Sequence, residues 1–376
     1  MIQKTIGIVG GGQLGRMLTL SAHQMGYKVV VVDPVENCPA YQVGATQIKA
    51  DLKDSNAIKK LAKSSDVITL EIEHVDVDTL EELVKSGFPV HPSPKTVKII
   101  NDKLLQKQFL QKSKIPVAPF VGIDNEADAR KALKQFNGKM LIKTRQGGYD
   151  GRGNIVVDSP SKIKQALKQF AGQPVYAEEY IPFSKELAAM VARTTNGEIK
   201  LYPVVETVHK RNICIEVLVP ADVNDKTTKK AEAVVKKVAK NLNGAGVFGI
   251  ELFLTKKGSI IVNEIAPRVH NSGHYTTEAN STSQFEQHIR AVLGLPLGST
   301  ELVVNNAAMV NILGERDGPT AVTGLDKSLK IPNVKVHIYG KSPTKIDRKM
   351  GHITATGKTL QSAKLKANKA RSNLSV

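Results

Sequence analysis

Two acidic residues within otherwise apolar stretches suggest a site for a divalent cation. Glu251 lies in GIELFL and Glu264 lies in IVNEIAP, directly after Asn263. Both stretches read as strands joined by a turn at 256–258, so the carboxylates are expected on neighbouring strands. Carboxylate and amide oxygens suit Mg²⁺, and buried acids need a charge partner or a metal. A salt bridge, for example with Arg268, is the alternative explanation.

A glycine-rich stretch, QGGYDGRGN at 146–154, could hold phosphates. It follows KMLIKT and precedes NIVVD, so it joins two antiparallel strands and does not open a helix as a P-loop does. Glycines leave backbone N–H donors open to a phosphate, and Lys143 in the preceding strand adds a positive charge. A hairpin without function would not explain why Tyr149, Asp150 and Arg152 lie inside the turn.

A second glycine motif lies near the N-terminus. Gly10 to Gly15 match G-x-G-x-x-G between a strand and a helix, and Asp33 ends the next strand, where an acid could bind a ribose. Read alone, this motif predicts an NAD-dependent oxidoreductase. No dehydrogenase catalytic pair follows it, so that function is kept only as an alternative. The minimal interpretation is a helix N-terminus that faces an anion.

Composition favours a soluble globular protein, and the net charge requires an anionic partner to be considered. The net charge of +18 comes from 53 Lys plus Arg against 35 Asp plus Glu, and the lysines are spread over helix-like segments as a solvated surface. Nucleic-acid binding is the alternative, but aromatic residues make up only 5% and no stacking motif interleaves the lysines. We therefore expect no nucleic-acid partner.

Cysteine usage and hydropathy predict a cytoplasmic protein. Cys38 and Cys214 are too few for a disulfide framework or a zinc site, so both are expected to be reduced core residues. The N-terminus leads directly into a strand without a signal-peptide pattern, and no apolar run is long enough to cross a bilayer. No membrane partner is expected.

The chain of 376 residues is long enough for two or three domains. Residues 1–101 alternate strand-like and helix-like segments, which predicts a doubly wound parallel sheet; the expected strands are KTIGIVG, YKVVVVD, ATQIKA, DVITLE and FPVHPS. Residues 102–296 open with an amphipathic helix and continue as mixed α+β, with a hairpin turn at Asn196-Gly197. Residues 297–376 read as a small β-rich domain that ends in a helix.

Taken together, these motifs resemble the ATP-grasp ligases. The order Lys103, Lys143, glycine loop, EEYI, Glu186, Glu251 and Asn263-Glu264 matches that family's plan. GGGQLGRML, LEIEHV, NDKLLQK, QGGYDGRG and NEIAPRVHNSGH are closely similar to the 5-(carboxyamino)imidazole ribonucleotide synthase family of purine biosynthesis, over about residues 5–355. The resemblance implies a pre-ATP-grasp domain, a two-lobed ATP-grasp domain whose lid lobe spans about 117–180, and a small C-terminal domain.

The resemblance also implies a reaction, in which ATP and bicarbonate give carboxyphosphate and its carboxyl group passes to the exocyclic amine of 5-aminoimidazole ribonucleotide. The implied cofactor is Mg²⁺, or Mn²⁺ in its place, held by Glu251, Glu264 and Asn263. The implied catalytic residues are Arg152, Arg268, Glu73, Tyr149 and Asp150. The implied ATP-binding residues are Lys103, Lys143, Gly148, Tyr149, Asp150, Gly151, Arg152, Gly153, Asn154, Glu178, Glu179, Tyr180, Ile181, Glu186, His209, Asn263 and Glu264. The implied residues around the ribonucleotide are Gly12, Gln13, Leu14, Glu73, His270, Asn271, Ser272, Lys341 and Arg348.

One segment departs from the family pattern. Relatives carry a shorter run resembling R-P-G-R-K-M-G-H, whereas this chain has KIDRKMGH without Pro-Gly. The choice among Lys341, Lys345 and Arg348 as anchors for the substrate phosphate therefore stays open. A homodimer is expected, as in relatives. The nearest alternative function is a sister ligase, such as formate-dependent glycinamide ribonucleotide transformylase.

Overall fold

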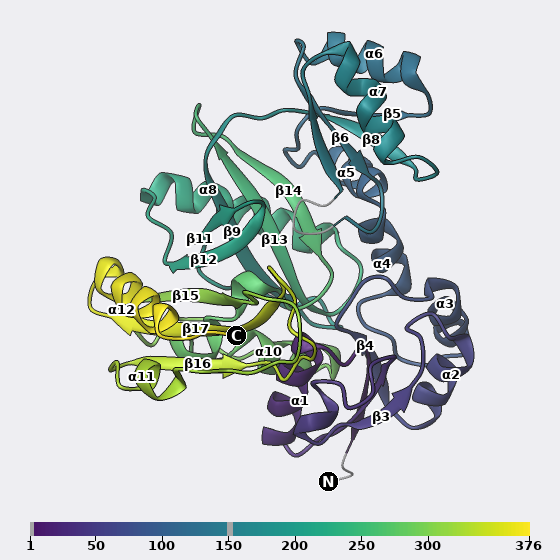
Figure 1. Ribbon diagram of the computed structural model, residues 1–376. Coiled ribbons are helices and arrows are strands. Elements are labelled where there is room, and N and C mark those ends of the chain that lie inside the picture. Colours follow the sequence, from purple (N-terminus) through teal and green to yellow (C-terminus); the bar gives the residue numbers. More distant parts are fainter. Residues whose placement is uncertain (1–3, 149–152) are drawn as a thin grey trace.

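The computed structural model describes residues 4–148 and 153–376. Its N-terminal part is a parallel sheet with strand order β3-β2-β1-β4 and helices on both faces (Figure 1). The strands are β1 (Thr5–Val9), β2 (Lys28–Asp33), β3 (Thr46–Lys49) and β4 (Val67–Leu70), and the helices are α1 (Gln13–Gln24), α2 (Ser55–Lys63) and α3 (Val77–Lys85), with a 3-10 turn at Tyr41–Val43. The predicted doubly wound sheet is confirmed.

Alternating side chains explain the two covered faces of this sheet. Ile6 and Ile8 of β1 pack in the cluster that contains Leu18 of α1, whereas Val9 packs with Leu61 of α2. A fully buried parallel strand is apolar on both faces, as KTIGIVG is. The fifth expected strand, FPVHPS, is wrong as a strand, because it contributes only a parallel bridge between Val90 and Ile68. Its prolines have no N–H to donate to a ladder.

The lid lobe is a four-stranded antiparallel sheet, among the described residues, with order β5-β8-β6-β7. Its strands are β5 (Phe120–Ile123), β6 (Met140–Thr144), β7 (Asn154–Val157) and β8 (Val175–Glu179), and its helices are α6 (Glu126–Gln135) and α7 (Pro160–Gln169). Both helices cover one face of the sheet (Figure 1). Because β6 pairs with β7, the predicted antiparallel hairpin around the glycine loop is confirmed. Helices α4 (Pro94–Asn101) and α5 (Lys103–Lys112) connect the lobe to the N-terminal sheet.

A second antiparallel sheet forms the rest of the molecule, with order β14-β13-β9-β11-β12-β15-β17-β16 and β10 paired to β9. Its strands are β9 (Phe183–Arg193), β10 (Ile199–Leu201), β11 (Val205–Lys210), β12 (Ile213–Val219), β13 (Gly246–Thr255), β14 (Ile260–Ala266), β15 (Asn306–Leu313), β16 (Val334–Ile338) and β17 (Lys349–Gly357). The helices are α8 (Asp225–Asn241), α9 (Thr276–Ala279), α10 (Gln284–Val292), α11 (Leu325–Leu329) and α12 (Leu360–Ser372), with a 3-10 turn at Asn271–Gly273. The hairpins expected at 196–197 and 256–258 are both present, as β9-β10 and β13-β14.

The C-terminal strands continue this same sheet. Strand β15 pairs with β12 through Val217 and Met309, so no gap in hydrogen bonding separates residues before and after 297. Helix α12 covers β15 and β17 with Ala363, Ala367 and Ala370 (Figure 1). The local residue pattern suggested a separate β-rich unit. Such a pattern does not show which strands from distant segments pair with each other.

The structure also bears on the cysteine and membrane predictions. Cys38 and Cys214 are both buried and neither is in a disulfide bond, as predicted. Within the described residues, no helix is both long enough and apolar enough to cross a membrane.

Candidate active site

A cavity of about 1150 Å³ lies between the N-terminal sheet, the lid lobe and the large sheet. The residues predicted from sequence that line it are Gly12, Gln13, Leu14, Glu73, Lys103, Lys143, Gly148, Asn154, Tyr180, Glu186, His209, Glu251, Asn263, Glu264, Arg268, His270, Asn271, Lys341 and Arg348. The predicted residues that are described but are not among its lining are Gly153, Glu178, Glu179, Ile181 and Ser272. Tyr149, Asp150, Gly151 and Arg152 lie outside the described residues.

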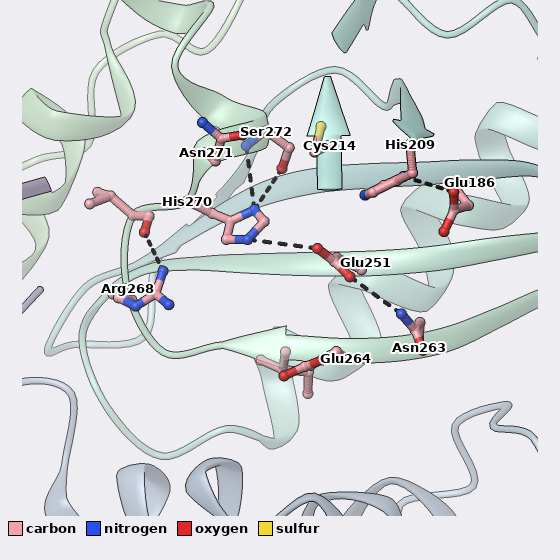
Figure 2. Close-up of polar contacts among 12 residues, drawn as sticks. Glu186, His209, Cys214, Glu251, Asn263, Glu264, Arg268, His270, Asn271 and Ser272 are labelled. Atoms are coloured by element: carbon pink, nitrogen blue, oxygen red, sulfur yellow. Dashed lines mark hydrogen bonds and ion pairs between the residues drawn. The ribbon is translucent and has the colours of Figure 1, made fainter. Parts of the chain in front are cut away.

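The paired acids lie on neighbouring strands, as expected. Glu251 of β13 is directly opposite Glu264 of β14, and the register shifts by one residue after Glu251. Asn263 Nδ2 donates to Glu251 Oε2 at 3.3 Å (Figure 2). Burial raises the pKa of Glu251, and the like charge of Glu264 raises that pKa further. Two adjacent carboxylates and an amide oxygen facing a cavity therefore form an anionic site that suits a divalent cation.

Lys103, the first residue of α5, supplies a positive charge beside these acids. Its Nζ lies 3.0 Å from Glu264 Oε2. The salt bridge that the sequence suggested with Arg268 is thus made by Lys103. Asp102 caps α5 by accepting the backbone N–H groups of Leu104 and Leu105, and this cap fixes where Lys103 begins the helix.

Arg268 forms an ion pair with Glu73, and both residues line the cavity. Arg268 Nε lies 2.7 Å from Glu73 Oε2, and Nη2 lies 3.2 Å from Oε1. Burial alone would raise the pKa of Glu73, but Arg268 outweighs it and lowers that pKa to about 2. The sequence assigned these residues to different substrates, whereas the fold joins them into one planar, two-bonded ion pair.

His270 lies next to the acidic pair and is neutral. Burial and the nearby Arg268 lower the pKa of His270 to about 3. Ser272 N–H donates to His270 Nδ1 at 3.4 Å, and His270 Nε2 lies 3.7 Å from Glu251 Oε1 (Figure 2). Ser272 does not line the cavity but orients this ring, because its Oγ also lies 2.9 Å from Nδ1.

Glu186 and His209 form a further pair on the large sheet. His209 Nδ1 lies 2.7 Å from Glu186 Oε2, and they come from the adjacent strands β11 and β9 (Figure 2). Burial would lower the pKa of His209, but the contact with Glu186 raises it overall. Stacked rings of Phe183 and Phe253, 4.5 Å apart, line the same cavity. This region thus combines an apolar wall with a carboxylate that can accept hydroxyl donors.

Glu178 of β8 plays a part that the sequence did not indicate. Its side chain is 2% exposed, and it accepts from Lys107 Nζ and Lys143 Nζ, each at 3.3 Å. Tyr176 OH also donates to it at 3.1 Å. Burial would raise the pKa of Glu178, but Lys107 and Lys143 together hold it below its ordinary value. Lys143, expected to contact phosphates, is thus anchored by a buried carboxylate at the cavity wall.

Glycines at the base of the hairpin allow its two strands to meet. A Cβ on Gly153 would lie 2.5 Å from Thr144 Oγ1 and 2.9 Å from the Cα of Gly148. Thr144 N–H donates to the carbonyl of Gly153 at 2.9 Å, so the contact is part of the ladder. Glycine is required at these positions because any side chain would separate the strands that carry Lys143 and Asn154.

The N-terminal glycine motif binds the protein's own carboxylates. Glu71 accepts from the N–H groups of Gly12, at 2.6 Å, and Gly15, at 2.5 Å, and Asp33 accepts from Gly11 at 2.8 Å. These donors are the ones that a dinucleotide pyrophosphate would need. The structure therefore argues against the NAD-dependent alternative. The amides of Gly12 and Gly15 are thus occupied, and Gln13 between them lines the cavity.

The structure separates the three candidate phosphate anchors. Lys341 and Arg348 line the cavity, whereas Lys345 is not among the lining residues. Lys341 Nζ contacts Gln13 Oε1 and donates to the Lys349 carbonyl at 3.0 Å. Arg348 Nη1 donates to the carbonyl of Pro343 at 2.5 Å. The geometry favours Lys341 and Arg348 over Lys345.

Sequence reasoning missed several residues that line this cavity, among them Glu71, Phe183, Phe253 and Lys349, and two neighbours of the lining residues that do not line it themselves, Lys107 and Arg145. Two of them had a visible signal: Lys107 lies one helical turn after Lys103, and Arg145 directly precedes the glycine loop. Arg145 forms a two-bonded pair with Asp102, with Nε 2.9 Å from Oδ2. Glu71 lay within a quoted motif, but nothing in the sequence showed that it would bind glycine amides.

Family models cover most of the chain. A ribonucleotide synthetase preATP-grasp domain matches residues 3–101, an ATP-grasp domain matches 108–285, and a phosphoribosylaminoimidazole carboxylase C-terminal domain matches 307–366. The chain spans about two thirds of the length of curated fungal relatives called phosphoribosylaminoimidazole carboxylase, at 42–43% identity.

Relatives of similar length carry a different name. The N5-carboxyaminoimidazole ribonucleotide synthase of Bacillus subtilis is 42% identical over 93% of this chain and 90% of that one. The crystal structure of the N5-carboxyaminoimidazole ribonucleotide synthetase of Thermotoga maritima has 45% identity and a TM-score of 0.90 over 99% of both chains. The Aspergillus clavatus synthase in complex with ADP and 5-aminoimidazole ribonucleotide has 37% identity and a TM-score of 0.91 over 98% of both chains.

Proposed function

This chain belongs to the N5-carboxyaminoimidazole ribonucleotide synthase family of ATP-grasp ligases, and from that premise we propose its reaction in detail. The enzyme uses ATP and bicarbonate to carboxylate the exocyclic amine of 5-aminoimidazole ribonucleotide. The products are the N5-carboxyamino ribonucleotide, ADP and phosphate, and the step belongs to purine biosynthesis.

The observation that carries this proposal is the convergence of three charge sets on one cavity. Lys103 meets Glu264, Arg268 meets Glu73, and Lys341 lies beside Gln13, each pair joining segments distant in sequence. The reaction has three anionic substrates, which are a triphosphate with its metal, a small oxyanion and a phosphorylated ribonucleotide. Each of them needs one such group of residues. The cavity, of about 1150 Å³, is large enough to hold substrates of this size together.

The nucleotide lies between the lid lobe and the large sheet in this proposal. Lys103 and Lys143 contact its phosphates, and the backbone of residues 178–181 reads the adenine. Glu186 accepts from the ribose hydroxyls beside His209, whose ring the carboxylate already contacts. We assign the loop from Gly148 to Asn154 to the phosphates, and its described ends, Gly148 and Asn154, line the cavity.

Mg²⁺, or Mn²⁺ in its place, fits the acidic site. The raised pKa of Glu251 reflects burial next to the like charge of Glu264, a cost that a divalent cation would relieve. Glu251, Glu264 and the amide oxygen of Asn263 would hold the ion. When bound, it neutralises charge on the phosphates of the nucleotide.

In the first step, a bicarbonate oxygen attacks the γ-phosphorus, and the bond to ADP breaks to give carboxyphosphate. Lys103 and Lys143 stabilise the charge that develops on the phosphoryl oxygens. Arg268 and Arg152 hold the bicarbonate. Among partners in the described residues, Arg268 uses one N–H on Val269 and two on Glu73, so two of its five donors stay open to an oxyanion.

In the second step, the exocyclic amine attacks the carboxyl carbon, phosphate leaves and the nitrogen loses a proton. We assign Glu73, Tyr149 and Asp150 to contacts with the ribonucleotide, where a carboxylate can orient the amine or take its proton. Asn271 and His270 contact the imidazole side of the ribonucleotide, with His270 held by Ser272. Lys341 and Arg348 bind its phosphate, and Gly12 to Leu14 line the wall next to it.

We further propose the domain limits 1–101, 102–296 and 297–376, a homodimer and a cytoplasmic location. The partners are the three small substrates, with no nucleic acid. The first limit is supported by the change from a parallel to an antiparallel sheet. Sedimentation of the full chain tests the oligomeric state.

Product formation tests the function directly. Purified protein with MgATP should release ADP when 5-aminoimidazole ribonucleotide and ¹³C-bicarbonate are both present, and ¹³C NMR should detect the new carbamate carbon. Glycinamide ribonucleotide with formate should not stimulate ADP release. Stimulation by that second pair instead would assign the chain to the sister transformylase, and absence of ADP release with both pairs would reject the ligase function.

A further inference from the structure

The buried lysine of helix α5, Lys107, has no part in the reaction as described so far. Its side chain is 2% exposed, and its Nζ donates to Glu178 Oε1 at 3.3 Å and to the carbonyl of Val262 at 3.4 Å. A buried ammonium is costly unless it is paired, so a lysine at this position needs a reason.

Glu178 is shared between two lysines of different exposure. Lys143 Nζ lies 3.3 Å from Glu178 Oε2, and Lys143 lines the cavity. Lys107 approaches the other oxygen, Oε1, from behind, and it is not among the residues that line the cavity. Two ammonium groups and one carboxylate leave one positive charge in excess, and the member of the trio that lines the cavity is Lys143.

The same helix face carries both lysines toward the site. Lys103 and Lys107 are four residues apart and therefore point the same way from α5. Lys103 contacts Glu264 of β14, while Lys107 contacts Glu178 of β8 and a carbonyl of β14. Helix α5 thus places one cation in the cavity and one directly behind it.

We infer that Lys107 is a positioning residue for the nucleotide: by neutralising Glu178 from behind, it leaves the positive charge of Lys143 available to a phosphate. This inference rests on the proposed function, because it assigns an adenine nucleotide to the cavity. Without Lys107, Lys143 and Glu178 would form a neutral pair at the wall. A phosphate would then have to compete with the carboxylate for Lys143.

Direct binding of MgADP to the full chain, measured by calorimetry, tests the inference. Lys107→Met should weaken MgADP binding about tenfold, the size expected for about 1.4 kcal/mol. Lys112→Met is the matched control, since Lys112 is an exposed lysine at the end of the same helix, and its binding should equal that of the wild type.

A double variant separates charge balance from simple structural support. In Lys107→Met/Glu178→Gln the carboxylate is gone together with its rear partner, so Lys143 is again unpaired and much of the lost affinity should return. A merely structural Lys107 predicts no such recovery. Equal affinity of Lys107→Met and wild type, or a double variant as weak as the single one, would overturn the inference.

Thermal unfolding of each variant accompanies the binding data. If Lys107→Met does not fold, Lys107→Gln and Lys107→Gln/Glu178→Gln keep a polar group at the buried position and make the same comparison. Equal affinities in that pair and the wild type also reject the inference. Failure of the wild type itself to bind MgADP would reject the proposed function instead, so the two failures are distinguishable.

Discussion

The guanidinium of Arg268 holds the carboxylate of Glu73 through two parallel contacts, although the residues are 195 positions apart. The pair joins the segment after β14 of the large sheet to the loop after β4 of the N-terminal sheet. It therefore fixes the distance between the part of the cavity proposed for the ribonucleotide and the part proposed for bicarbonate. Both side chains are largely buried, so the pair is little screened by solvent.

This pair predicts a pH dependence of stability. The folded pKa of Glu73, about 2, is below the ordinary value of 4.5, so ionised Glu73 stabilises the fold fully above about pH 4.5. That contribution is lost as the pH falls from about 4.5 toward about 2. Urea unfolding across this range should show a shallower loss of stability in Glu73→Gln than in wild type.

Glu301→Gln is the control for that comparison, because Glu301 is exposed. It should keep the slope of the wild type, and an unchanged slope in Glu73→Gln would contradict the role assigned to the pair.

Glu264→Gln should reduce turnover about 100-fold or more, the size typical for loss of an electrostatic group at a reacting centre. The change removes one of the paired charges proposed to hold the metal, but leaves a side chain of the same shape opposite Glu251. Steady-state kinetics at rising Mg²⁺ concentration and circular dichroism measure the two effects. Near-normal turnover at every magnesium concentration, low ones included, would contradict the assignment of Glu264 to the metal site.

Gly153→Ala tests the base of the glycine loop. The added methyl group would lie 2.5 Å from Thr144 Oγ1, so the two strands must move apart. We expect the KM for ATP to rise about tenfold with a small change in melting temperature, because β7 is an edge strand of its sheet. Gly122→Ala, in β5 of the same lobe, is the control, since a Cβ there meets only Leu104 at 3.5 Å.

The role assigned to Gly153 at the base of the loop would be wrong if Gly122→Ala and Gly153→Ala changed the KM for ATP equally. It would also be wrong if Gly153→Ala lowered turnover without any change in that KM.

Lys341→Ala should raise the KM for 5-aminoimidazole ribonucleotide about tenfold or more, because a charged contact to a phosphate is lost. The KM for ATP should stay as in wild type, since Lys341 lies next to Gln13 and not next to the acidic pair. Lys345→Ala is the matched control, because Lys345 is exposed and is not among the cavity residues. Initial rates with each substrate varied separately give both constants. A larger effect from Lys345 would reverse the choice of anchor.

Local patterns predicted much of this fold because they report local geometry. The spacing of apolar residues and the turn residues predicted the hairpin around the glycine loop, the β13-β14 turn at Gly258 and the parallel N-terminal sheet. FPVHPS failed as a strand because its proline content outweighs its apolar character. The continuity of the sheet through β12 and β15 was also missed, since pairing between strands from different segments leaves no local periodicity.

The sequence by itself determined the kinds of charge at the site and their order along the chain, because each motif keeps its residue types within a few positions. Only the tertiary structure decided which charges meet. Lys103 reaches Glu264 over 161 positions, Glu71 takes the amides of Gly12 and Gly15, and Glu178 is shared by Lys107 and Lys143. Such contacts depend on how helices and sheets pack against each other, and side-chain pairing across packed elements is not encoded in the spacing of residues along one element.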